Sequence, residues 1–124
     1  VVVALKEAGL PIGEYIVFDE ATDPNNLLGR PDGYTSKANF HDTRLDFADD
    51  FDVTSGGSVE VFATANLRDE RAEYIDGIVS ALPIVGRQYL YTANGGVLLR
   101  LPYALTPSDA EAYERALHAA FGEP

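Results

Sequence analysis

The 124-residue sequence contains no cysteine, methionine or tryptophan. Without cysteine the chain can form no disulfide, no thiolate metal site and no cysteine nucleophile, although this leaves its cellular compartment open. Methionine is missing even at position 1, where Val1 stands. We therefore expect that an upstream segment, an export signal or a linker, has been removed.

Basic residues are scarce, because nine Lys and Arg stand against twenty Asp and Glu, which gives a net charge of −11. Nucleic acid and anionic membranes both require a basic surface, so neither is expected as a partner. Long apolar runs are also missing: the opening VVVAL ends at Lys6, far short of the roughly 20 residues that span a bilayer. Membrane contact is expected only through a lipid anchor on a removed N-terminal segment.

Sequence signatures of common enzymes are absent. The chain has no G-x-S-x-G elbow, no G-x-x-x-x-G-K-[ST] loop, no G-x-G-x-x-G after a strand and no H-E-x-x-H helix. We therefore assign no catalytic residue, no metal site and no cofactor from the sequence. A non-enzymatic role is favoured.

The residues that are present indicate one globular domain over residues 1–124, with 46% hydrophobic and 10% aromatic residues. Hydrophobic periodicity and turn residues predict helices and strands in alternation. The expected helices are 1–8, 66–81 and one that begins after Thr106, and the expected strands are 14–18, 38–42, 43–47, 58–63, 87–92 and 96–101. This order predicts an α+β fold: an antiparallel or mixed sheet of about four to five strands, with two to three helices packed mainly on one face.

Two local signals are more specific. Asn94-Gly95 between two apolar strands predicts a type I′ hairpin turn. Asn66 is the expected N-cap of the central helix, with Asp69 in the capping-box position. The apolar stripe of that helix includes a single charged residue, Arg71, among the following positions at helical spacing: Leu67, Arg71, Tyr74, Ile75, Ile78 and Leu82.

A long polar segment, TDPNNLLGRPDGYTSK at residues 22–37, separates the first two expected strands. Asp23-Pro24 and Pro31-Asp32-Gly33 each predict a turn, and the Leu27-Leu28 pair predicts an apolar anchor between them. The segment is therefore an ordered Ω-type loop, which either binds a ligand or simply caps an open sheet face. Its candidate binding residues are Asp23, Asn25, Asn26, Arg30, Tyr34 and Lys37, of which Arg30 suits a bidentate contact with a carboxylate or phosphate.

Acidic side chains and His41 offer two further hypotheses. Asp19, Glu20, Asp23 and His41 could serve a hydrolytic enzyme if two or more of them met in one pocket, although a turn opener and a surface histidine are the favoured interpretations. A second group could bind a cation, although its spacing departs from the calcium-loop pattern and favours a solvated acidic turn. The members of this group are Asp46, Asp49, Asp50 and Asp52.

Four segments together resemble a family of small exported domains of unknown function from Gram-positive bacteria, often the folded part of lipoproteins. The segments are TDPNNLLGRPDGYTSKANFHD (22–42), GGSVEVF (56–62), YLYTANGGVLLRL (89–101) and LTPSDAEAY (105–113). The resemblance spans residues 4–117 and is most specific in TDPNNLLGRP and YTSK. It implies an extracellular or cell-surface location, with a removed N-terminal lipobox as a tether, and no particular activity.

The leading hypothesis from the sequence is an extracytoplasmic, non-enzymatic binding module that presents loop 22–37 to its partner. That partner would be a small polar ligand, a cell-wall component or a protein. The hydrolytic enzyme is one alternative. The other is a structural domain that self-associates through an exposed sheet face or edge.

Overall fold

The computed structural model describes residues 1–46, 50–81 and 86–124. Its centre is a five-stranded sheet in the order β1-β2-β3-β5-β4, in which every neighbouring pair is antiparallel. The strands are β1 (Ile12–Val17), β2 (Ser36–Asp42), β3 (Gly56–Val61), β4 (Gln88–Ala93) and β5 (Val97–Pro102). The helices are α1 (Val2–Glu7), the short 3-10 turn η1 (Val53–Ser55), α2 (Ala65–Ala81) and α3 (Pro107–Phe121). The predicted α+β fold is thus confirmed.

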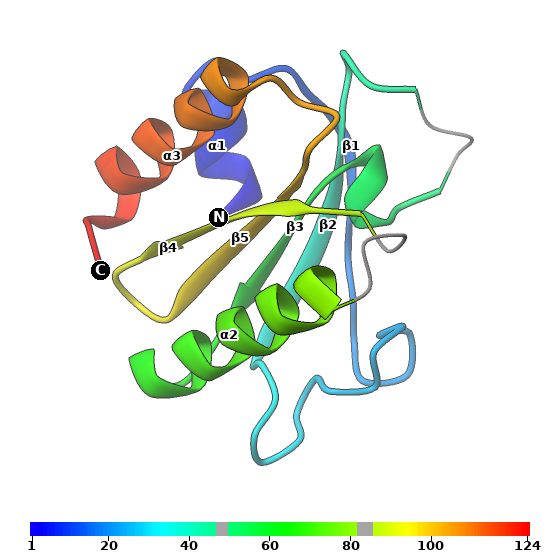
Figure 1. The fold of residues 1–124 in the computed structure, drawn as a ribbon, viewed down its shortest axis with the longest axis vertical. Coiled ribbons are helices and arrows are strands. Elements are labelled where there is room, and N and C mark those ends of the chain that lie inside the picture. The colour runs from blue at the N-terminus through cyan, green and yellow to red at the C-terminus, as the bar shows by residue number, and fades with distance from the viewer. Residues whose placement is uncertain (47–49, 82–85) are drawn as a thin grey trace.

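The helices cover both faces of the sheet. Helices α1 and α3 lie together on one face, whereas α2 crosses the other (Figure 1). Successive side chains of β5 point to opposite faces of the sheet. Leu99 packs in the core under α1 and α3, and Leu98 packs in the core under α2. No described helix is long and apolar enough to cross a membrane.

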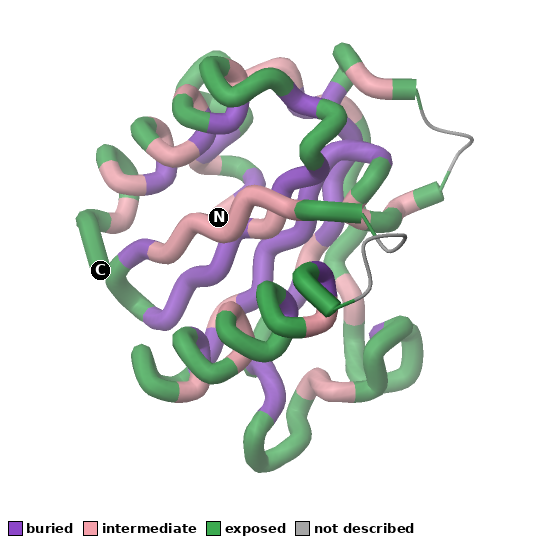
Figure 2. The backbone as a smooth tube through the Cα atoms, in the orientation of Figure 1, coloured by how far each residue is buried: buried purple, intermediate pink, exposed green. Residues whose placement is uncertain are grey.

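The two faces differ in composition. The core under α1 and α3 is apolar and large, with Phe40, Leu99 and Leu117 fully buried. The inner strands of the sheet are largely buried along their length (Figure 2). The core under α2 is smaller and consists of Tyr34, Phe62, Ile75, Val79 and Leu98. Beside it, the same face of the central strands carries polar side chains, including the buried Glu60. The α2 face of the central strands is therefore the more polar one.

A buried carboxylate fastens α3 to the sheet. Asp42, at the end of β2, is fully buried and accepts a 2.7 Å hydrogen bond from the Tyr113 hydroxyl of α3. Arg44 donates to the same carboxylate through its backbone N–H, Nε and Nη2 and also pairs with Asp109 in the first turn of α3. Burial alone would raise the pKa of Asp42, but these hydrogen bonds hold it below its usual value of 3.8.

Several local predictions were wrong for identifiable reasons. The turn after β4 spans residues 94–96, with positive φ at Gly95 and Gly96 but not at Asn94, so it is not the type I′ turn. Gly96 is held against the chain after β3, where it accepts a hydrogen bond from Phe62 N. The first turn of α2 is capped by Thr64, whose Oγ1 accepts from Leu67 N, in place of Asn66.

Other expectations concern the ends and edges of elements. Residues 43–46 form a turn after β2, where a strand over 43–47 was expected. Tyr74, expected in the buried stripe of α2, is 60% exposed. Edge strand β1 exposes Tyr15, Ile16 and Val17, which is the edge that the self-association hypothesis would use. Predictions for Phe47, Asp49, Leu82 and the helix stop at Pro83 lie outside the described residues.

Candidate functional site

The segment between β1 and β2, called loop 18–35 below, is organised by one carboxylate. Asp23 is buried and accepts hydrogen bonds from the backbone N–H groups of Asn25, Leu27 and Leu28 at 3.0, 2.8 and 2.8 Å. The Tyr34 hydroxyl donates to the same carboxylate at 2.7 Å. Burial alone would raise the pKa of Asp23, but these four donors hold it below its usual value of 3.8.

Apolar contacts attach this loop to the α2 core. Leu27 and Leu28 pack against that core, and the fully buried Tyr34 meets Phe62 edge-on at 5.9 Å. A Cβ atom on Gly33 would lie 1.8 Å from the carbonyl oxygen of Leu27, so the second turn fits only glycine. The two turns and the Leu27-Leu28 anchor expected from the sequence are confirmed.

Tyr34→Phe should lower the free energy of unfolding by about 1–2 kcal/mol. The change removes a buried donor to Asp23 and also the acceptor of the Asn25 amide, which donates to the Tyr34 hydroxyl at 3.2 Å. Urea denaturation measures the loss. Tyr103→Phe, at a 52% exposed position, is the matched control and should stay close to wild type. Equal stability of the two variants would show that the hydroxyl does not hold the loop.

A cluster of charged side chains lies on the α2 face of the sheet. Glu60 of β3 is fully buried and pairs with three cations from other elements. Lys37 Nζ lies 3.0 Å from Oε2, Arg71 Nε lies 3.0 Å from Oε1, and Arg100 Nη1 lies 2.9 Å from Oε2. Lys37 also donates to Ser58 Oγ at 2.7 Å. The cluster therefore carries two more positive charges than negative ones.

The surroundings shift the pKa values of the cluster. Burial alone would raise the pKa of Glu60, but Lys37, Arg100 and Arg71 outweigh it and hold this pKa below the usual 4.5. For Lys37 the balance is opposite, since burial lowers its pKa despite the attraction of Glu60. Burial, together with repulsion from Arg71, likewise lowers the pKa of Arg100. One carboxylate thus does not fully compensate one buried and two partly buried cations.

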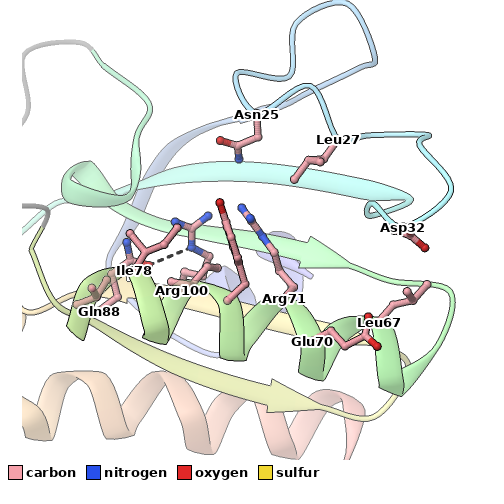
Figure 3. Close-up of a pocket in the computed structure, with 12 residues that line it drawn as sticks. Asn25, Leu27, Asp32, Leu67, Glu70, Arg71, Ile78, Gln88 and Arg100 are labelled. Atoms are coloured by element: carbon pink, nitrogen blue, oxygen red, sulfur yellow. Dashed lines mark hydrogen bonds between the residues drawn. The ribbon is translucent and has the colours of Figure 1, made fainter. Parts of the chain in front are cut away.

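A cavity of about 580 Å³ lies above this cluster, between loop 18–35 and α2. The loop contributes Asn25, Leu27 and Asp32, the sheet contributes Gln88 and Arg100, and α2 contributes the remaining lining: Leu67, Glu70, Arg71, Tyr74, Ile75, Ile78 and Val79. The guanidinium groups of Arg71 and Arg100 point toward the part of loop 18–35 that carries Asn25 and Leu27 (Figure 3). The cavity therefore has a cationic floor and largely apolar walls.

Part of each guanidinium is left without a hydrogen-bond acceptor among the described residues. Arg100 uses Nε for Gln88 and Nη1 for Glu60, and Arg71 uses Nε and, at 3.5 Å, Nη2 for Glu60. Within the described ranges, no protein acceptor meets Nη2 of Arg100 or Nη1 of Arg71. These N–H groups are available to a molecule in the cavity.

The structure separates the six binding residues predicted from the sequence. Asn25 lines the cavity. Lys37 was expected to be exposed on the loop, but it is 2% exposed and belongs to the Glu60 cluster. Asp23 and Tyr34 are buried within the loop and hold its shape. Asn26 and Arg30 lie on its exposed side, where Arg30 Nη2 donates to Asn26 Oδ1 at 3.1 Å.

Three important residues, Glu60, Arg71 and Arg100, were missed as site residues. Glu60 and Arg100 each stand among apolar residues of a strand. The alternation of polar and apolar residues along β3 and β5 did not show whether the polar face of the sheet was buried. Arg71 gave the clearest signal, because it was the one charge in the expected apolar stripe of α2. A charge at a predicted core position needs a partner, and here that partner is Glu60.

The residues of the hydrolase hypothesis do not meet in this cavity. Asp19 and Glu20 are exposed, Asp23 is committed to the loop, and none of the described lining residues belongs to that group. His41 is 2% exposed, not the surface histidine expected, because residues 50 and 51 cover it. Its Nε2 lies 2.7 Å from the Asp50 carbonyl oxygen, and its ring stacks on Phe51 at 4.1 Å.

The acidic segment offers no metal centre in the part of the chain that is described. No group of three or more His, Asp or Glu side chains is arranged there to hold an ion, although Asp49 lies outside the described residues. Asp52 instead caps η1 by accepting from Thr54 N at 2.8 Å. Among the described lining residues there is no serine, threonine, lysine or histidine, and the carboxylates of Asp32 and Glu70 are exposed.

Comparisons with protein-family models, curated proteins and solved structures gave no match for this chain. The cavity is open to solvent on one side and combines a largely apolar surface with a few convergent donors, which is the usual arrangement of a small-molecule site.

Proposed function

We propose that the chain is an extracytoplasmic, non-enzymatic binding module whose ligand occupies the cavity between loop 18–35 and α2. One observation carries the proposal: the guanidinium groups of Arg71 and Arg100 face a cavity of about 580 Å³ with N–H groups that no described protein atom uses. A volume of this size suits a small organic ligand. The described lining has no serine, threonine, lysine or histidine, and its two carboxylates, Asp32 and Glu70, are exposed, which favours binding over catalysis.

The ordered loop supports the same proposal. Asp23 and its four donors fix the loop on one side of the cavity, while Leu27 and Leu28 attach it to the α2 core. A site formed before the ligand arrives avoids the entropic cost of ordering a loop on binding. The extracytoplasmic location rests on the resemblance of TDPNNLLGRP and YTSK to exported domains, and protease treatment of intact cells tests it.

Filling the cavity should abolish binding. Fragments that shift the backbone amide signals of cavity residues in ¹H–¹⁵N spectra of the wild type should bind Ile78→Phe at least about tenfold more weakly. Ile78 is a half-buried lining residue on α2, so a phenyl group there takes up ligand space. Ala119→Phe, at an exposed position of α3 on the opposite face, is the matched control. If both variants bind the fragments equally, the cavity is not the site.

A further inference from the structure

We infer that the ligand is an amphipathic organic acid, whose carboxylate pairs with Arg71 and Arg100 while its apolar body lies along α2. This inference rests on the proposed function, because it names the chemical class of the molecule in the same cavity. It comes from the charge balance of the floor, from the donors left on the two arginines and from the composition of the walls.

The charge balance favours an anion. Lys37, Arg71 and Arg100 have exposed side-chain fractions of 2%, 13% and 12%, and they share the single carboxylate of Glu60. Buried charges are costly unless they are paired, and here positive charge is in excess. The lowered pKa values of Lys37 and Arg100 agree with this excess. An incoming carboxylate would reduce it, although the protein as a whole carries a net charge of −11.

Two acidic residues also line the cavity and oppose an anion. Asp32 on the loop and Glu70 on α2 are both exposed, whereas the arginines form the buried floor. Charges in contact with water are screened, so the rim acts on a bound anion more weakly than the floor does. The two rim acids therefore favour a ligand whose charged group reaches the floor and whose rim end is neutral.

The donors and walls specify the two ends of the ligand. Guanidinium N–H groups form strong charge-assisted hydrogen bonds with carboxylates. Each arginine keeps one terminal nitrogen, Nη2 of Arg100 and Nη1 of Arg71, that no described protein acceptor uses. Leu27 lies across the cavity from the α2 side chains of Leu67 and Ile78 (Figure 3), and Ile75 of α2 adds to the apolar lining. Such walls stabilise an apolar body in proportion to the surface it buries. An acid with an aromatic or branched hydrocarbon body meets both demands.

A matched pair of compounds tests the inference. 1-Naphthylacetate and 1-naphthylacetamide share the same apolar body and differ in charge, and their affinities can be measured by calorimetry and by ¹H–¹⁵N titration. We expect the acid to bind about tenfold or more tightly than the amide, because hydrogen bonds to charged groups contribute more than neutral ones. Raising the salt concentration should weaken the acid alone.

Variants at Arg71 connect this preference to the floor. Arg71→Gln should reduce the difference between acid and amide to about twofold or less, whereas Arg71→Lys, which keeps the charge beside Glu60, should retain part of it. Arg115→Gln, at an exposed position of α3, is the control and should leave the difference unchanged. Urea denaturation of each variant checks that it is folded under the binding conditions.

The outcomes separate this inference from the function beneath it. If acid and amide bind the cavity equally, the acid class is wrong while the binding cavity stands. If 1-naphthyl phosphate binds more tightly than 1-naphthylacetate, the carboxylate is the wrong head group. If neither naphthyl compound nor any neutral fragment shifts the signals of Ile78 and its neighbours at millimolar concentration, the proposed function fails as well.

Discussion

Glu60→Ala should reduce the free energy of unfolding by about 3–5 kcal/mol, the range for breaking a buried ion pair from one side. The variant leaves Lys37, Arg71 and Arg100 close together on the α2 face without their shared carboxylate. The largest part of the cost is expected at Lys37, whose charge is 2% exposed and would keep only Ser58 as a hydrogen-bond partner among the described residues. Chemical denaturation monitored by tyrosine fluorescence and circular dichroism measures the effect.

The control for this prediction is Glu111→Ala on the exposed side of α3, which should change stability by less than about 0.5 kcal/mol. A double-mutant cycle with Lys37→Ala adds a second check. The loss in the double variant should be smaller than the sum of the two single losses, because each single change leaves its partner buried and unpaired. A loss below about 1 kcal/mol for Glu60→Ala would mean that water already compensates the cluster.

Asp42→Ala should cost about 3 kcal/mol, because it removes a buried carboxylate that accepts four hydrogen bonds. We expect less than for Glu60, since Arg44 is 36% exposed and can turn toward water when Asp42 is lost. The buried hydroxyl of Tyr113 cannot do so and would lose its acceptor. The cost therefore falls mainly on the attachment of α3 to β2.

The pH dependence of stability tests the role of Asp42 independently. The folded-state pKa values of Asp42 and Asp23 lie below their usual 3.8, and that of Glu60 lies below 4.5. Over this acidic range the unfolded chain binds more protons than the folded one, so stability rises with pH. The contribution is fully present above about pH 5 and is lost as the pH falls through the lowered folded values.

Asp42→Ala should therefore flatten the rise in stability between about pH 3 and pH 5, by about 1.4 kcal/mol for each unit that the folded state lowers the pKa. Urea midpoints collected across this range provide the measurement. Asp46→Ala, at an exposed position, should leave the slope unchanged. A variant curve parallel to the wild type at every pH would show that Asp42 has an ordinary pKa in the folded protein.

Local signals in the sequence predicted most of the elements. Helix α2 was expected at 66–81 and spans Ala65–Ala81, and the two hairpin strands were displaced by about one residue. Such features depend on periodicity and turn residues within a short window. The prediction of the hairpin turn was wrong, and Gly96 in that turn accepts a hydrogen bond from Phe62 N, a contact that lies outside any short window of sequence.

The candidate site depends on contacts of that longer kind. Glu60 and Arg100 are 40 residues apart and meet because β5 returns beside β3, which the sequence order alone did not show. The loop prediction found one wall, including Asn25 and the Leu27 anchor. Arg71 stood out in the sequence as the one charge in an apolar stripe, but its partner, Glu60, could be identified only from the three-dimensional structure.

The strand order also has a kinetic consequence. Strands β1, β2 and β3 follow one another along the chain and pair as neighbours, whereas β5 is separated from its partner β3 by α2 and β4 in the sequence. Contacts between distant segments form slowly, since a large loop must close first. Until then β3 is an open edge, with Glu60 paired at most to Lys37 and Arg71. A chain interrupted before β5 would expose that edge to other chains, so the Glu60–Arg100 contact marks the step that completes the sheet.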